Sequence, residues 1–398
     1  MLRSLLTRAA VPAVCLGLLW GAAPAHAGTP ATARPVSSAA WADRATSTYR
    51  ALQSHLYEGS EASGLYLEHT PRQATDQAHS YLWPFREAAQ AAVDMQELPR
   101  TGKDFAADAA QRFDTMERYA GPTGYQSYLP APLGAGGDVY YDDNAVVALS
   151  QLDQYEATGD RTLLGRAEQA VPVVSRAWDD DTSKACPGGM DWYDSPSNSI
   201  RATNVTALSA QLAARLYERT HNRSYLDKAE QWYGWVYSCM RKAPGLYVND
   251  RGDDGSTNET LWTYNSGAMI GTATALYRGT GDATYLDKAV ADAQGSLAHW
   301  TEGTRLHDQP AVFNAFYFKD LLDLDRVRPD AAYLQAMSAY ADSTYRTNRD
   351  ATTGLFRFQA SGGGDYDPQA PAGTLHQSAM VQIFATLADA TRKSHRSQ

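Results

Sequence analysis

Apolar residues recur at helical spacing along three segments that share one sequence frame. Each apolar stripe runs into a tyrosine, and these tyrosines, Tyr155, Tyr217 and Tyr277, are separated by 62 and 60 residues. A Thr-Gly-Asp or Thr-His-Asn link follows shortly after each tyrosine and leads into a second stretch with apolar residues at helical intervals. Because a fixed period of this size marks a repeated supersecondary unit, each repeat of about 60 residues is predicted to be a helical hairpin.

The residues of the links support this prediction. Gly159 and Gly281 can adopt the left-handed conformation that ends many helices. Asp160, Asn222 and Asp282 follow at the position where a side-chain oxygen accepts a hydrogen bond from the first turn of the next helix. The links are therefore expected to be short turns between two antiparallel helices.

Six hairpins account for the length of the chain. Removal of a leader of 27 residues, described below, leaves 371 residues, which is close to six repeats. We find no alternating strand pattern of comparable quality, and we predict an all-α toroid of six helical hairpins. The Gly-rich stretch 361–373 is not a domain boundary in this interpretation, because the segment after it is too short to fold alone and closes the ring. The inner helices are expected to begin near Trp83-Pro84, Asp142-Asp143, Asn204, Tyr264-Asn265, Phe313-Asn314 and His376-Gln377.

Residues 1–27 have the features of a secretory signal peptide. Two arginines precede an apolar run, and Ala25-His26-Ala27 is a small-residue cleavage site. We expect a secreted protein whose mature part, 28–398, is a single catalytic domain without a membrane span. Of the three cysteines, Cys186 and Cys239 remain in the mature chain, and two cysteines in an exported protein suggest one disulfide.

Composition and charge exclude several classes of partner. The formal net charge is -10, which argues against nucleic acid or an anionic membrane surface as the main partner. The histidines form no ligand pair of the H-x-x-x-H type, and phosphate-binding loops are absent, so we expect neither a metal site nor a cofactor. The 42 aromatic residues suit a neutral partner, and we expect the protein to be a monomer.

The repeat frame brings polar residues from distant parts of the chain to one rim. The inner helices of a ring of hairpins run in the same direction, so their N-termini meet, and Asp142 and Asp143 lie at such an N-terminus. Helix capping is one interpretation of this pair, although capping requires only one aspartate. Two carboxyl groups in a neutral, aromatic-rich cleft are also what glycoside hydrolysis requires. Adjacent helical residues point about 100° apart, which leaves both retaining and inverting geometries open.

Aromatic and amide residues near the expected rim are candidates for sugar contacts. Trp192 and Tyr193 belong to this group, but core packing is an equally good interpretation of any single aromatic residue. His376 lies at the last expected helix start, where we interpret it as a hydrogen-bonding group and not a base. The candidate substrate-binding residues are Trp83, Tyr141, Asn144, Asn204, Trp262, Tyr264, Asn265, Phe313, Asn314 and Gln377.

The segment Gly136-Gly-Asp-Val-Tyr-Tyr-Asp-Asp-Asn-Ala145 resembles glycoside hydrolase family 76, the endo-α-1,6-mannanases. The resemblance implies an (α/α)6 barrel and a retaining mechanism in which Asp142 is the nucleophile and Asp143 the acid/base. It also implies that Asn144, Tyr264 and Asn265 hold the sugar, and that the substrate is an α-1,6-linked mannan backbone. Further segments that look like family signatures are Leu82–Phe85, Leu212–Tyr217, Trp262–Asn265, Gly267–Gly271, Phe313–Lys319 and Gln377–Phe384.

The sequence is also compatible with three alternative functions. A mannan transglycosylase would use the same glycosyl intermediate and transfer it to a sugar hydroxyl in place of water. A glycan-binding protein could use the toroid without any reaction. A six-hairpin glycosidase or lyase of another specificity would keep the fold and change the chemistry.

Overall fold

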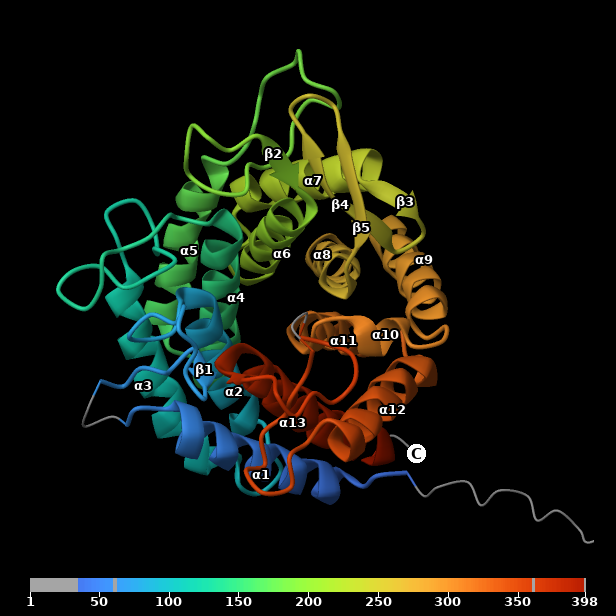
Figure 1. Cartoon of the computed structure of the whole chain (residues 1–398). Helices are drawn as coiled ribbons and strands as arrows, with labels where there is room; N and C mark the ends of the chain where they lie inside the picture. Colours follow the sequence, from blue (N-terminus) through green and yellow to red (C-terminus); the bar gives the residue numbers. More distant parts are fainter. Residues whose placement is uncertain (1–34, 60–62, 360–361, 397–398) are drawn as a thin grey trace, which may run out of the picture. The chain divides into compact units, whose positions relative to one another are not determined.

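In the part of the chain that the structure describes, six inner helices form a ring, and six outer helices pack around them (Figure 1). The computed structural model describes residues 35–59, 63–359 and 362–396. The expected signal peptide therefore lies outside the described residues. The inner helices are α2 (Leu82–Gln96), α4 (Tyr141–Thr158), α6 (Thr203–Thr220), α8 (Thr263–Thr280), α11 (Ala311–Asp325) and α13 (Thr374–Arg396).

Every inner helix begins within two residues of its expected start. The burial of the helices explains why the periodic pattern is weaker on the inside of the ring than on the outside. The inner helix α2 buries 13 of its 15 residues, whereas the outer helix α7 (Arg223–Cys239) buries six of 17. A helix covered on all sides loses the polar face that marks an amphipathic surface helix. The other outer helices are α1 (Ser38–Leu56), α3 (Ala106–Met116), α5 (Arg161–Ser175), α9 (Ala283–Trp300) and α12 (Ala331–Thr347).

The expected turns join three of the hairpins. Gly159 and Gly281 end α4 and α8 in the left-handed conformation, with φ of 76° and 74°. Asp160 then caps α5 by accepting a hydrogen bond from the Thr162 backbone N–H at 2.9 Å, and Asn222 and Asp282 do the same for α7 and α9. The predicted hairpins are therefore confirmed, together with the residues that shape their turns.

The last inner helix, α13, closes the ring between α11 and α2 (Figure 1). The first helix packs on it, and the rings of Trp41 and Phe384 stack with centroids 5.9 Å apart. Two short strands add to this closure, because β1 (His69–Thr70) pairs antiparallel with β6 (Ala372–Gly373) directly before α13 begins. The segment after the Gly-rich stretch thus belongs to the ring, as expected.

A small antiparallel sheet was not expected from the sequence. Its strands lead into two inner helices, because β2 directly precedes α6 and β5 comes just before α8, so the sheet lies at the N-terminal rim. With three to seven residues each, the strands are too short for alternation to stand out in the sequence. The strands are β2 (Ile200–Ala202), β3 (Arg241–Ala243), β4 (Leu246–Gly252) and β5 (Thr257–Leu261), in the order β2-β4-β3 with β5 also paired to β4.

Short helical elements also occur in the connections between the helices of the ring. A four-residue helix, α10 (Arg305–Asp308), precedes α11, and two 3-10 turns flank α3. Among the described residues, no helix is both long and apolar enough to cross a bilayer.

Candidate active site

The aspartate pair lies in the first turn of α4, at the N-terminal rim of the ring. Tyr140 precedes the helix in an extended conformation and makes no side-chain cap. Asp142 is the second helical residue, and its Oδ1 accepts a hydrogen bond from the Asp143 backbone N–H at 3.0 Å. Asp142 thus satisfies one N–H of the first turn, but the rest of its carboxylate faces other elements of the rim.

Two side chains from other parts of the chain hold the second oxygen of Asp142. Trp192 donates from Nε1 to Oδ2 at 3.0 Å, and Asn204 donates from Nδ2 to the same oxygen at 2.6 Å. Trp192 belongs to the long loop before α6, and Asn204 is the second residue of α6. The carboxylate therefore has three donors, which is an arrangement that holds an ionised carboxylate in one orientation.

Burial and hydrogen bonding have opposite effects on the pKa of Asp142. Burial raises the pKa of Asp142 to about 6, while the bonds from Trp192, from the backbone and from Asn204 lower it. At neutral pH the Asp142 carboxyl is therefore mainly ionised and can accept all of these hydrogen bonds.

Asp143 has the opposite environment. Within the described part of the chain, its carboxyl accepts no hydrogen bond. Burial raises the pKa of Asp143 well above its ordinary value, and the charges of Asp142 and Glu87 raise it further, against the opposing charge of Arg86. Both pKa values are therefore raised, but hydrogen bonds oppose the rise at Asp142, whereas the charges of Asp142 and Glu87 add to the rise at Asp143.

Glu87 is a component of the site that sequence reasoning missed. It is fully buried in α2 and accepts hydrogen bonds from Trp83 Nε1 at 3.1 Å, Arg86 Nη1 at 2.6 Å and Gln382 Nε2 at 2.8 Å. Arg86 also donates from Nε to the backbone carbonyl of Val146 in α4 at 3.0 Å. The spacing of Trp83 and Glu87, four residues apart on one helix face, is the one sequence signal that could have linked Glu87 to the rim.

Four of the expected sugar-contact residues form one aromatic cluster. The ring of Phe313 stacks on Tyr264 with centroids 4.0 Å apart and an interplanar angle of 6°. Trp262 packs edge-on against Phe313 at 5.3 Å, and Trp83 stacks on it at 6.0 Å. All four side chains keep partial exposure, so the cluster forms an accessible aromatic wall contributed by α2, α8 and α11.

Three of the expected amide contacts are occupied inside the protein. Asn144 is 1% exposed and bonds to the backbone of Tyr125 through both amide atoms. Gln377 bonds to the N–H and the carbonyl of Phe356, and Asn314 accepts from the Thr263 hydroxyl and donates to the Leu306 carbonyl. These residues hold rim loops in place, and we do not include them among the proposed substrate contacts.

Two of the remaining rim candidates are buried, and the third, His376, is partly buried. Tyr141 is 3% exposed, and Asn265 is fully buried with no partner for either amide atom among the described residues. Burial lowers the pKa of His376 to about 4, so this histidine is neutral, and its Nδ1 has no partner in the described part of the chain. None of the three presents a polar atom that the structure connects to the aspartate pair.

The loop that carries Trp192 is fixed at several points. Cys186 is disulfide-bonded to Cys239 at the end of α7, with Cα atoms 6.1 Å apart. Arg201, fully buried, donates to the carbonyls of Ala185, Cys186 and Gly188 at 2.9 to 3.0 Å. The disulfide and these hydrogen bonds therefore anchor the loop that carries Trp192.

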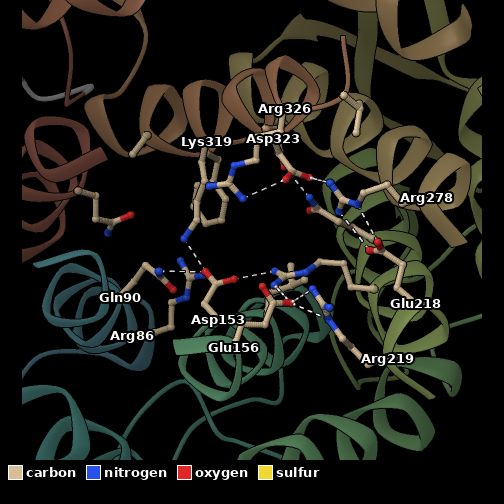
Figure 2. Close-up of a pocket in the computed structure, with 18 residues that line it drawn as sticks. Arg86, Gln90, Asp153, Glu156, Glu218, Arg219, Arg278, Lys319, Asp323 and Arg326 are labelled. Atoms are coloured by element: carbon tan, nitrogen blue, oxygen red, sulfur yellow. Dashed lines mark hydrogen bonds and ion pairs between the residues drawn. The ribbon is translucent and has the colours of Figure 1, made fainter. Parts of the chain in front are cut away.

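A cavity of about 340 Å³ lies at the opposite end of the ring (Figure 2). Residues of all six inner helices line it, and most of its charges pair with one another. Arg215 bonds to Asp153, and Arg278 joins Glu218 and Asp323. Asp153 is eleven residues after Asp142, which is about 17 Å along a helix. Neither Asp142 nor Asp143 lines the cavity, although Arg86, which bonds to Glu87, does.

A metal site finds no support in the described residues, which contain no group of three or more His, Cys, Asp or Glu side chains suited to a metal ion.

A ring of six hairpins with two neighbouring aspartates at its N-terminal rim defines a barrel of the (α/α)6 type. A family model for glycosyl hydrolase family 76 matches residues 40–395. The chain therefore belongs to glycosyl hydrolase family 76, and the expected family and barrel fold are confirmed.

Curated relatives share a shorter segment. Mannan endo-1,6-alpha-mannosidase DCW1 of Saccharomyces cerevisiae is 32% identical over 124 residues, which are 29% of this chain and 27% of the yeast protein. The chain thus matches about a quarter of the length of that relative.

Solved structures match nearly the whole ring. A family 76 mannosidase, Bt3792 from Bacteroides thetaiotaomicron, superposes with a TM-score of 0.77 and 21% identity, covering 89% of this chain and 99% of that chain. An inactive variant of the α-1,6-mannanase GH76A of Salegentibacter sp. HEL1_6, with two consecutive aspartates replaced by asparagine and α-1,6-mannotriose bound, gives a TM-score of 0.71 and 17% identity, covering 88% and 99%. At these identities the similarity shows the fold.

Proposed function

We propose that this chain is a secreted, retaining endo-α-1,6-mannanase that uses Asp142 as nucleophile and Asp143 as acid/base. The observation that carries the proposal is the contrast between the two neighbours: Asp142 is held by three donors, whereas the half-buried Asp143 carboxyl accepts no hydrogen bond from the described residues. Support for the substrate comes from the relatives, which include mannan endo-1,6-alpha-mannosidases and an α-1,6-mannanase with α-1,6-mannotriose bound.

The first half of the reaction uses both aspartates at once. The neutral Asp143 carboxyl gives its proton to the glycosidic oxygen as the bond from that oxygen to the anomeric carbon breaks. An Asp142 carboxylate oxygen forms a bond to the same carbon on the opposite face of the sugar. The products are a mannosyl-enzyme ester and the released sugar chain with its new hydroxyl.

The second half reverses these roles. Asp143, now a carboxylate, takes a proton from water as the water oxygen attacks the anomeric carbon and the ester bond to Asp142 breaks. Both aspartates return to their initial state. Two inversions at one carbon leave the released sugar with the α-configuration of the substrate.

The aromatic wall of Trp83, Trp262, Tyr264 and Phe313 is the proposed contact surface for sugar rings. Aromatic faces stack on the apolar faces of sugars, and these four side chains combine mutual packing with partial exposure. Asn204 is better described as a partner of the nucleophile than as a sugar contact. We further propose secretion, on the basis of the signal-like residues 1–27 and of the Cys186–Cys239 disulfide.

The proposal is tested by incubating the purified mature chain with linear α-1,6-mannan and following products by size and by NMR. We expect short oligomers that are α-configured at first release. Products longer than the substrate would assign the chain as a transglycosylase, and an unchanged mannan that nevertheless binds the protein would assign it as a glycan-binding protein. The Asp142→Asn variant serves as the inactive control.

A further inference from the structure

Trp192 has an unusual combination of exposure and inward contact. Its side chain is 38% exposed, one of only four large hydrophobic side chains with such exposure among the described residues. Its polar atom nevertheless points to the reaction centre, because Nε1 donates to Asp142 Oδ2 at 3.0 Å. An exposed indole without a role would leave its N–H to water.

The backbone of Trp192 is tied to the same helix end as its side chain. The Trp192 carbonyl accepts a hydrogen bond from the Tyr141 backbone N–H at 3.0 Å, so Trp192 contacts two consecutive residues of the first turn of α4. Its own N–H donates to Asn198 Oδ1 at 3.1 Å. The indole packs against the rings of Tyr140 and Tyr193, with centroid distances of 5.1 and 6.1 Å.

The loop behind Trp192 restricts its movement. Gly189 has φ of +93°, and a Cβ at this position would lie 2.4 Å from the Trp235 ring. This backbone conformation therefore accommodates only glycine. Trp235 in turn donates from Nε1 to the Cys186 carbonyl at 3.1 Å, next to the Cys186–Cys239 disulfide. The loop that leads to Trp192 is therefore anchored to α7 at Trp235 and at the disulfide.

The hydrogen bonds also distinguish the two oxygens of Asp142. Oδ2 accepts from both Trp192 and Asn204, so its in-plane lone pairs are occupied. Oδ1 accepts from the Asp143 N–H, which leaves it the less occupied of the two. An attacking oxygen must keep a lone pair free for the anomeric carbon.

We propose that Trp192 is a positioning residue that, with Asn204, holds Oδ2 of Asp142 so that Oδ1 is the atom that attacks the sugar. This inference rests on the proposed function and adds the orientation of the nucleophile. In the covalent step, the bond from Oδ1 to the anomeric carbon forms as the glycosidic bond breaks, and the proton of Asp143 goes to the leaving oxygen.

The effect of Trp192 extends to the protonation of the nucleophile. The titratable groups that interact with Asp142 include Asp143 on the same helix, Tyr140 before it and Tyr264 at the start of α8. Against the effect of burial, the bond from Trp192 lowers the pKa of Asp142. Removal of this donor must therefore move the ionisation of Asp142 to higher pH.

The test uses Trp192→Phe, which keeps an aromatic ring and removes only the N–H. We expect kcat on α-1,6-mannan to fall about ten- to a hundredfold with little change in KM, and the acid limb of the pH profile to move up by about one unit. The matched control is Trp178→Phe, the same substitution in the same loop at a residue that the described structure does not connect to Asp142. Circular dichroism of both variants verifies folding.

A second measurement does not depend on activity. Aspartate carboxyl NMR titrations of the full chain, with the Asp142 signal assigned by its loss in Asp142→Asn, should show the Asp142 titration shifted upward in Trp192→Phe and unchanged in Trp178→Phe. An unchanged Asp142 titration in Trp192→Phe overturns the inference, whatever happens to the rate. A wild-type chain inactive on mannan, but with the expected titration shift, would instead reject the proposed function and leave the positioning role of Trp192 supported.

Discussion

The two ends of helix α4 carry aspartates with opposite behaviour. Asp142 and Asp143 lie in its first turn, where the partial positive charge of a helix N-terminus should favour ionisation, yet burial raises the pKa of both. Asp153 lies in the last turns, where the helix should disfavour an anion. Although burial acts to raise it, the charges of Lys319 and Arg215 hold the pKa of Asp153 well below its usual range.

The difference shows that burial at one end of α4 and neighbouring charges at the other outweigh the helix dipole. Around the opposite end, cations and carboxylates from different inner helices pair across the cavity (Figure 2). At the N-terminal rim, the Asp142 carboxylate is held by neutral donors, and Arg86 is bound to Glu87. Ion pairs between helices therefore stabilise one end of the ring. At the other end, the pKa values of two carboxyl groups are raised above their ordinary range.

The largest expected effect is the loss of activity in Asp142→Asn. The amide cannot form the glycosyl ester, so hydrolysis of α-1,6-mannan should fall by more than about a thousandfold. The matched control is Asp153→Asn, the same change on the same helix, which should retain most of the rate in folded protein. Full activity of Asp142→Asn in a mannan assay would reject the assignment of the nucleophile.

The next largest effect is on stability. Here Asp153→Asn is expected to be the more damaging of the two variants, and Asp142→Asn the milder one. Asp153→Asn leaves Lys319 and Arg215 short of a partner and should reduce the free energy of unfolding by about 3 kcal/mol, whereas Asp142→Asn should cost less. Urea denaturation of both variants measures the difference. Equal stability of Asp153→Asn and wild type would mean that the ion pairs at this end contribute nothing to the ring.

The sequence predicted the ring better than it predicted the polar contacts. Hairpin turns depend on local residues, such as the left-handed glycine and the capping aspartate, and therefore leave a local signature. The bond between Trp192 and Asp142 joins residues 50 positions apart, and it depends on a loop shaped by a disulfide and by buried glycines.

The expected amide contacts show that a position at the rim does not by itself make a residue a substrate contact. Asn314 and Gln377 do lie at the starts of inner helices, but their amides satisfy backbone groups of neighbouring loops. Buried backbone groups require partners, and a rim of irregular loops supplies many of them. Sequence position alone does not distinguish an amide that faces the substrate from one that faces a loop.

The pH dependence follows from the same comparison. The proposed mechanism needs Asp142 ionised and Asp143 protonated, and burial raises the pKa of Asp142 to about 6. Activity should therefore increase as the pH rises through about 6 and decline at higher pH, where Asp143 loses its proton. A kcat/KM profile with an acid limb near pH 4, the ordinary aspartate range, would contradict the described environment.

The smallest expected effect is a gain in stability in Asp143→Asn at higher pH. A carboxyl whose pKa is raised in the folded state binds its proton more tightly there than in the unfolded chain. Its contribution is therefore fully present below the unfolded pKa of about 4 and is lost as the pH rises through the folded value. The asparagine has no proton to lose, so the melting temperature of the variant relative to wild type should rise by about 1 to 3 °C between pH 4 and pH 8. A constant difference across this range would count against the raised pKa of Asp143.

The most direct test of the central claim is to trap the glycosyl-enzyme with a 2-fluoro-2-deoxymannosyl donor that carries a good leaving group. Mass spectrometry of the digested protein then locates the sugar. A single mannosyl ester on Asp142, absent in Asp142→Asn, is the predicted result. An ester on Asp143 or on any other residue would contradict the roles assigned to the two aspartates.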